Sequence, residues 1–213
     1  MHTTKRVAIL LDGGFVLKRL YCLLGRRHAK ASEVLGFAGR CLDETEELFR
    51  IYYYDCPPSE DTKENPLAPG RVIDFGNTNT AKRIRALQAE LAESDLVAFR
   101  KGQLDFSGWG LSQNLTRTLL SDDGPPRALE AKDLTPGFRQ KRVDMKIGLG
   151  VAWLASKNLV DRIILVTGDT DFIPAMKFAR REGTQVVLVP MSSTYLSRDL
   201  REHADYVREF PFP

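Results

Sequence analysis

Residues 6 to 14 read Arg6-Val-Ala-Ile-Leu-Leu-Asp-Gly-Gly14. An apolar run that ends in an acid and two glycines is typical of a parallel strand that is buried on both faces and leads into a loop. Shorter apolar segments recur at residues 48–54, 96–99, 163–167 and 185–189. Because helical patterns separate these segments, the sequence predicts an α/β fold with three layers, in which helices cover both faces of a central, mainly parallel sheet.

The helices are predicted from apolar residues at helical spacing. The longest pattern begins at Val143 and continues through Ile147, Val151 and Leu154, which is the buried face of a helix. Further helices are expected at residues 15–24, 32–42, 81–91, 172–181 and 197–203.

The chain of 213 residues is long enough to bury one core, so a single domain over residues 1–213 is expected. Two segments interrupt its regular patterning. Residues 57–79 are rich in Pro, Gly and charged residues, and residues 102–140 combine Gly, Ser, Asp and Pro with weak periodicity. Both are predicted to be long loops or insertions within the domain. Trp109 and Phe138 lie in the second segment, where such rings either stack on an unpaired base or anchor a loop to the core.

The composition excludes several classes of protein. With 43% hydrophobic and 28% charged residues, the chain has no stretch long and apolar enough to cross a bilayer. The apolar run before Asp12 is too short for a signal peptide, so a cytoplasmic location is expected. Three widely spaced cysteines and three scattered histidines indicate neither a disulfide framework nor a zinc site. A net charge of +3 permits an anionic partner without requiring one.

Acidic residues follow two of the predicted strands. Asp12 ends the first strand, and the strand at residues 163–167 leads into Gly168-Asp-Thr-Asp171. Ligands of open α/β sheets bind beyond the carboxyl ends of the strands. Carboxylates that are packed together either raise one another's pKa or recruit a cation, and ligand sets made only of oxygen favour Mg²⁺ or Mn²⁺. Such an ion activates water and stabilises charge on phosphate, so this pattern points to hydrolytic nuclease chemistry.

Each acid also has a structural interpretation. Asp169 or Asp171 could cap the helix that follows, since Asp is a preferred capping residue. Asp144 is expected in the first turn of the long helix, where an acid complements the helix dipole. Alternatively, Asp144 is a metal ligand flanked by cations that bind phosphate. These cations are Lys141, Arg142 and Lys146.

Three motifs resemble the LabA-like branch of the NYN domain family, which belongs to the PIN-like superfamily of metal-dependent ribonucleases. The motifs are ILLDGG (residues 9–14), KRVDMKIG (141–148) and VTGDTDF (166–172), followed by EGTQVVLV (182–189). The resemblance implies a PIN-like, Rossmann-like sheet, dependence on Mg²⁺ or Mn²⁺, and an RNA substrate, single-stranded or structured, with tRNA among the candidates. It also implies an acidic cluster of Asp12, Asp144, Asp169 and Asp171 with Thr167 beside it. A homodimer is expected from the resemblance alone.

Two positions depart from the family pattern. Phe15 stands where relatives commonly carry Asn, and Gly150 stands where the helix usually carries a further Asp. Glycine inside a helix is unfavourable by about 0.5–1 kcal/mol relative to alanine, so local folding does not account for Gly150.

Three functions follow from these observations, in order of preference. The first is a metal-dependent endoribonuclease. The second is a catalytically weakened NYN domain that binds RNA or protein, with Gly150 as its marker. The third is a phosphatase of the haloacid-dehalogenase type, which needs a second acid at the position of Gly14.

Overall fold

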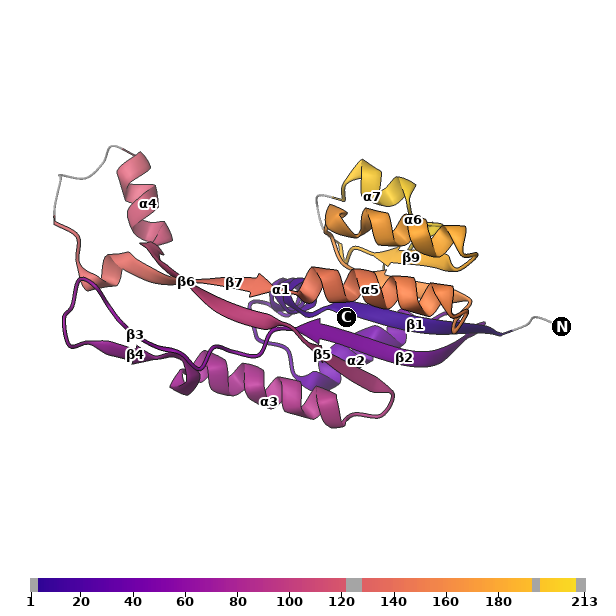
Figure 1. The fold of residues 1–213 in the computed structure, drawn as a ribbon, viewed down its shortest axis with the longest axis horizontal. Helices are drawn as coiled ribbons and strands as arrows, with labels where there is room; N and C mark the ends of the chain where they lie inside the picture. The colour runs from indigo at the N-terminus through magenta and orange to yellow at the C-terminus, as the bar shows by residue number, and fades with distance from the viewer. Residues whose placement is uncertain (1–3, 122–127, 193–195, 210–213) are drawn as a thin grey trace. The chain divides into compact units, whose positions relative to one another are not determined.

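The computed structural model describes residues 4–121, 128–192 and 196–209, and the chain divides into two compact units (Figure 1). The first unit comprises Met1–Asp55, Leu87–Gly102 and Arg142–Pro213, and the second comprises Cys56–Ala86 and Gln103–Lys141. The two segments expected to be loops, residues 57–79 and 102–140, fall almost entirely in the second unit. The single-domain organisation stays a prediction.

A six-stranded sheet forms the centre of the first unit, and every strand pair in it is parallel. The strand order is β10-β9-β8-β1-β2-β5. Residues 7–11 of the central strand β1 are completely buried, as the continuous apolar run predicts. The strands are β1 (Lys5–Asp12), β2 (Glu46–Asp55), β5 (Val97–Lys101), β8 (Arg162–Val166), β9 (Gln185–Val189) and β10 (Tyr206–Val207).

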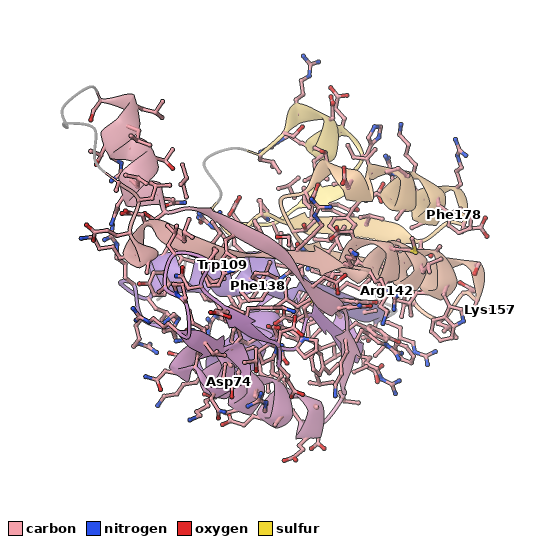
Figure 2. All side chains as sticks on the ribbon, turned by 60° about the vertical axis from the view of Figure 1, so that its left-hand side comes forward. Asp74, Trp109, Phe138, Arg142, Lys157 and Phe178 are labelled. Carbon is pink, nitrogen blue, oxygen red and sulfur yellow. The ribbon has the colours of Figure 1, made fainter. Side chains whose placement is uncertain are left out.

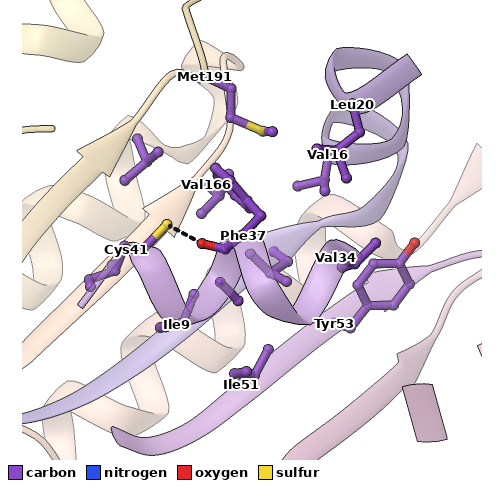
Figure 3. Packing of buried hydrophobic residues seen from close by; sticks show 14 of the residues in the cluster. Ile9, Val16, Leu20, Val34, Phe37, Cys41, Ile51, Tyr53, Val166 and Met191 are labelled. Carbon is purple, nitrogen blue, oxygen red and sulfur yellow. Dashed lines mark hydrogen bonds between the residues drawn. The ribbon is translucent and has the colours of Figure 1, made fainter. Parts of the chain in front are cut away.

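Helices cover both faces of this sheet, which confirms the three-layer α/β prediction. On one face, Ile9, Ile51 and Val166 pack against side chains of two helices, among them Val34 and Phe37 (Figure 3). On the other face, α5 lies along β1 and β2 (Figure 1). The helices are α1 (Gly13–Leu23), α2 (Ala31–Arg40), α3 (Asn79–Glu93), α5 (Val143–Ser156), α6 (Ile173–Arg181) and α7 (Arg198–Glu202), with a short 3₁₀ helix η3 (Thr170–Phe172) before α6. Among the described helices, none is long and apolar enough to cross a bilayer.

The second unit contains regular structure where the sequence predicts loops. Two antiparallel pairs form it, β3 (Thr62–Glu64) with β4 (Val72–Asp74), and β6 (Gln103–Leu111) with β7 (Leu134–Lys141). The unit also includes η1 (Phe75–Asn77), α4 (Gln113–Leu120) and η2 (Ala131–Asp133). Most residues of β6 and β7 are partly or fully exposed, so neither strand shows the hydrophobic alternation of a half-buried sheet. For this reason the sequence shows no clear strand pattern in residues 102–140.

Aromatic rings form the packed centre of the second unit. Phe75 lies 5.0 Å from Phe138 between ring centroids, and Phe106 lies 5.9 Å from Trp109. Figure 2 labels Trp109 and Phe138 on the β6–β7 pair. Trp109 and Phe138 therefore pack within the second unit, against Phe75 and Phe106.

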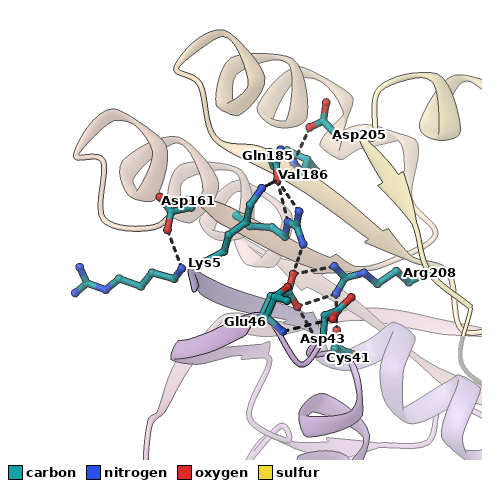
Figure 4. Close-up of polar contacts among 12 residues, drawn as sticks. Lys5, Cys41, Asp43, Glu46, Asp161, Gln185, Val186, Asp205 and Arg208 are labelled. Carbon is teal, nitrogen blue, oxygen red and sulfur yellow. Dashed lines mark hydrogen bonds and ion pairs between the residues drawn. The ribbon is translucent and has the colours of Figure 1, made fainter. Parts of the chain in front are cut away.

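A buried ion-pair network joins strands at the amino-terminal edge of the sheet (Figure 4). The side chain of Glu46 is completely buried and accepts hydrogen bonds from Arg162 and Arg208. Burial alone would raise the pKa of Glu46, but the hydrogen bonds from Arg208, the Asp43 backbone and Arg162 lower it to about 2. The ionised carboxylate therefore stabilises the fold above its ordinary pKa of 4.5, and this contribution is lost as the pH falls toward 2.

Substituting Glu46→Gln is expected to lower the free energy of unfolding by about 3 kcal/mol at pH 7, because two largely buried guanidinium groups lose their counter-charge. Chemical denaturation measures this effect. The control is Glu202→Gln, which removes an exposed pair with Arg198 and should change stability by less than about 0.5 kcal/mol. Equal effects of the two substitutions would contradict this account of the network.

Candidate functional site

The carboxyl ends of β1 and β8 place Asp12 beside Thr167. The two strands are adjacent and parallel, and Leu11 pairs with Val166 immediately before these residues. The Thr167 hydroxyl donates to Asp12 Oδ2 at 3.4 Å. Asp12 Oδ1 accepts from the Phe15 backbone N–H at 3.2 Å and so caps α1. The first predicted acid is thus oriented by the neighbouring strand and by the helix that follows it.

The Gly168-Asp-Thr-Asp171 turn continues from the same threonine. Thr167 Oγ1 accepts from the Asp169 backbone N–H at 3.2 Å, and Asp169 Oδ1 accepts from the Asp171 backbone N–H at 2.9 Å. The capping interpretation is therefore confirmed for Asp169, which caps η3, whereas Asp171 lies exposed within η3. Thr167 bonds to both loops and links the positions of Asp12 and Asp169.

The carboxylates influence one another electrostatically. Asp144 lies in the first turn of α5, as the sequence predicts. Burial raises the pKa of Asp12 to about 6, and the charges of Asp144 and Asp169 add to this rise against the lowering effect of the hydrogen bonds from Phe15 and Thr167. The pKa of Asp144 is also raised, by burial and then by the charges of Asp169 and Asp171. Negative charge therefore accumulates in one region of the first unit.

The donor set suits a hard divalent cation, because it consists of four carboxylates and a hydroxyl. In the described part of the chain, however, no three His, Cys, Asp or Glu side chains form a group that could hold a metal ion as they are placed. Asp12 and Asp169 each use one oxygen for capping, and the second oxygen of Asp12 also accepts from the Thr167 hydroxyl. The carboxylates and the hydroxyl are therefore suited to a divalent cation, but the side chains as they are placed do not form a complete ligand set.

Two glycines allow the loops to approach closely. A Cβ atom on Gly13 would lie 2.7 Å from the Tyr54 carbonyl oxygen, and a Cβ atom on Gly168 would lie 2.9 Å from the Phe15 ring. Phe15 therefore packs over the loop that holds Asp169. Its side chain contributes packing at this edge rather than a polar ligand.

The three predicted phosphate-binding cations have different surroundings. Arg142 precedes α5 in the left-handed conformation, with φ of 69°, and is exposed. Lys146 is exposed on α5 and donates to the Lys101 carbonyl. Lys141 belongs to the second unit and forms an ion pair of 2.6 Å with Asp105. Arg142 and Lys146 share with Asp144 the first turns of α5, whereas the charge of Lys141 is partly compensated.

Asp55 is a further acid at the end of a strand. The sequence pattern does not reveal it, because the predicted strand ends at Tyr54, whereas β2 continues to Asp55. It is buried and accepts from the Tyr53 hydroxyl at 3.3 Å and from Gln88 at 3.0 Å. The signal in the sequence is the alternation of β2, which places Asp55 on the same face of the strand as Tyr53, two residues earlier. Because donors surround it, Asp55 is suited to holding the Tyr53 ring against Gly13 rather than to binding a ligand.

Tertiary packing accounts for Gly150. A Cβ atom at this position would lie 2.2 Å from the Tyr54 hydroxyl oxygen and 3.3 Å from the nearest ring carbon. Any side chain would displace the Tyr54 ring, which is buried between α5 and the sheet. The local sequence gives no reason for a glycine at this position. The reason is its close contact with Tyr54 of β2.

Replacing Gly150 with alanine is expected to destabilise the fold by about 1–3 kcal/mol through overpacking, although the same change usually stabilises a helix. The penalty should shrink in a Tyr54→Phe background, because the oxygen at 2.2 Å is then absent. Gly148→Ala on the same helix is the matched control, since its Cβ would meet no atom closer than 3.9 Å and should stabilise by about 0.5–1 kcal/mol. Thermal and chemical unfolding of the four variants measure these effects, and equal behaviour of the two glycines would contradict the assigned contact.

The raised pKa of Asp12 predicts a stability effect that depends on pH. The folded pKa of about 6 exceeds the ordinary 3.8, so the contribution of this group to stability is present below pH 3.8 and is lost as the pH rises through 6. Asp12→Asn keeps a capping oxygen and does not titrate. At pH 8 without metal, this variant should be more stable than the wild type by about 1–2 kcal/mol after allowance for solvent screening, and the difference should vanish near pH 4. Denaturation at both pH values tests it, and a gain in stability at pH 4 equal to that at pH 8 would refute it.

Comparisons with known proteins identify the family and support the fold. The sequence profile of the NYN domain matches residues 72–210, a range that includes Asp144, Thr167, Asp169 and Asp171 and begins after Asp12. A solved structure of a protein of unknown function from Vibrio parahaemolyticus RIMD 2210633 is similar in fold, with a TM-score of 0.53 and 16% identity. The match covers 98% of this chain and 94% of that chain. No match was found among curated proteins.

Proposed function

Since the chain belongs to the NYN domain family, a nuclease-related family that is typically metal-dependent, we propose that it is an endoribonuclease that uses Mg²⁺ or Mn²⁺ to hydrolyse phosphodiester bonds of RNA. One observation carries the proposal. Burial and the charges of neighbouring carboxylates raise the pKa of Asp12 at the end of β1 and of Asp144 at the start of α5. A divalent cation would relieve this repulsion, which is the electrostatic condition for recruiting one.

The residues that would hold the ion are Asp12, Asp144, Asp169 and Asp171. When bound, the ion would supply an activated water and neutralise charge on the phosphate oxygens. Thr167 serves as a positioning residue, because its hydroxyl bonds to Asp12 and accepts from the backbone of Asp169. These contacts keep two carboxylates aimed at the same edge of the sheet.

Arg142 and Lys146 are suited to contacting RNA phosphates. Both are exposed and lie within two residues of Asp144 on either side. Contacts to phosphate carry no sequence information, so these residues would position a strand without selecting its bases. Lys141 would contribute less, because Asp105 already neutralises part of its charge.

A binding module without catalysis is the second candidate, and Gly150 favours it. The acid that the family resemblance implies at this position would displace the Tyr54 ring, because the Tyr54 hydroxyl lies where its Cβ would be. A chain with one acid fewer binds a metal less strongly. RNA binding in EDTA together with the absence of cleavage in Mn²⁺ would identify this function.

Incubation of the protein with a mixed RNA pool in Mn²⁺, Mg²⁺ or EDTA tests the nuclease proposal. We expect cleavage in Mn²⁺ or Mg²⁺, none in EDTA, and a loss of about 100-fold or more in Asp169→Asn, which keeps an oxygen for capping but loses the charge. The matched control is Asp199→Asn, an exposed acid in the first turn of α7, which should leave the rate unchanged. Cleavage that persists in EDTA and in Asp169→Asn would exclude the proposed mechanism.

A further inference from the structure

A pocket of about 330 Å³ lies between α5 and the sheet of the first unit, outside the acidic cluster. Its volume is near the lower end of the range of about 300–1,000 Å³ for small-molecule sites, so it suits a single chemical group rather than a large ligand. Its walls come from β2, β5 and α5, and they include Tyr52, Tyr54, Arg100, Lys146, Gly150 and Trp153.

The walls combine an aromatic ring with positive charge. The Trp153 side chain is half exposed on α5, although tryptophan usually buries most of its surface. Arg100 and Lys146 are both exposed, and the Arg100 guanidinium lies 5.6 Å from the centroid of the Tyr52 ring. The pocket therefore offers a surface for stacking beside two cations.

Tyr54 lines this pocket, and among the residues that the structure describes its hydroxyl has no hydrogen-bond partner. Tyr54 is only 2% exposed. Within the described residues, every fully buried side-chain nitrogen or oxygen has a hydrogen-bond partner, and this hydroxyl has none. The oxygen must consequently reach the open space that Tyr54 lines. Burial raises the pKa of Tyr54 against the opposing charge of Arg100, so the group stays protonated and can donate a hydrogen bond.

We propose that this pocket binds one unpaired nucleobase of the RNA substrate, stacked on Trp153 and hydrogen-bonded by Tyr54, with the adjacent phosphate held by Arg100 and Lys146. The inference rests on the proposed nuclease function for its choice of ligand. A planar group with polar edges that is linked to a phosphate meets all of these features together. A purely apolar partner would leave the Tyr54 hydroxyl unsatisfied and the two cations without an acidic counterpart.

The position of the pocket fits a strand that also reaches the acidic cluster. Lys146 lines the pocket and lies two residues after Asp144 on α5. Trp153 follows nine residues after Asp144, which corresponds to about 14 Å along the helix and about half a turn around it, so the two side chains project from opposite faces of α5. A strand of several nucleotides that passes around α5 would reach both, so the bound base would lie outside the scissile step.

Gly150 makes the pocket possible. A side chain here would lie 2.2 Å from the Tyr54 hydroxyl and would push the ring into the cavity. The position that carries an acid in relatives is thus part of a binding surface in this chain. With Gly150, the chain lacks a carboxylate at this position and has space there that a base can enter.

The test measures binding of fluorescently labelled single-stranded RNA homopolymers in EDTA, where cleavage does not interfere. We expect Trp153→Ala to weaken binding by about 5–100-fold, the usual effect of losing one stacking ring. Tyr54→Phe should weaken it by about 2–10-fold and alter the preference among the four bases. The control is Phe178→Ala, which removes an exposed ring that projects from α6 and does not line the pocket (Figure 2).

A second measurement leaves the pocket intact. The chain has two tryptophans, so Trp109→Phe leaves Trp153 as the fluorophore, and RNA should quench its emission with the same affinity as in the binding assay. Unchanged affinity in Trp153→Ala together with unquenched emission would overturn the proposal. So would a loss of self-association in Trp153→Ala without any change in RNA affinity, because the face would then bind a second copy.

The two proposals can fail separately. Binding that depends on Trp153 in a chain that does not cleave RNA would support the pocket and refute the nuclease. If cleavage depends on Asp169 but RNA affinity does not change in Trp153→Ala, the nuclease proposal is supported and the pocket proposal is refuted.

Discussion

The parallel pairing of β1 with β8 is the constraint on which the candidate site depends. These strands lie far apart in the sequence, and their register sets Leu11 against Val166. Each strand then ends at the same edge, so Asp12 meets Thr167 and the turn that carries Asp169. Complete burial of the apolar residues of β1 stabilises this register, because a slip by one residue would move its side chains to the opposite faces of the sheet.

The carboxylates of the site serve folding and chemistry together. Asp12 caps α1 and Asp169 caps η3, so each organises the loop in which it lies. Burial, together with the charges of Asp144 and Asp169, raises the pKa of Asp12. The opposite edge of the sheet shows the contrasting case, since Glu46 is held ionised between two guanidinium groups. Compensated charge there stabilises the fold, whereas uncompensated charge at the site favours a ligand.

The contact between Tyr54 and Gly150 changes how the departure from the family pattern is understood. Considered alone, Gly150 indicates a lost carboxylate. In the structure it is also the place where the Tyr54 ring fits against α5 and where a pocket opens between cations and Trp153. Gly150 therefore provides the space both for the Tyr54 ring and for the cavity beside it.

The sequence by itself determined the parallel α/β sheet, the order of its main helices and the acids at its carboxyl edge, because burial on two faces and strand-end positions leave local patterns in Val7–Leu11 and Gly168–Asp171. Only the tertiary structure decided the β6–β7 pair, because its partly exposed strands lack hydrophobic alternation. The role of Gly150 also depends on the tertiary structure, because the residue that constrains it, Tyr54, lies about 100 positions away in the sequence. Asp55 was missed for a related reason, since its neighbours Tyr53 and Gln88 explain its burial only after folding. Local periodicity reports which surfaces are buried, and side-chain contacts between distant segments appear only once the chain has packed.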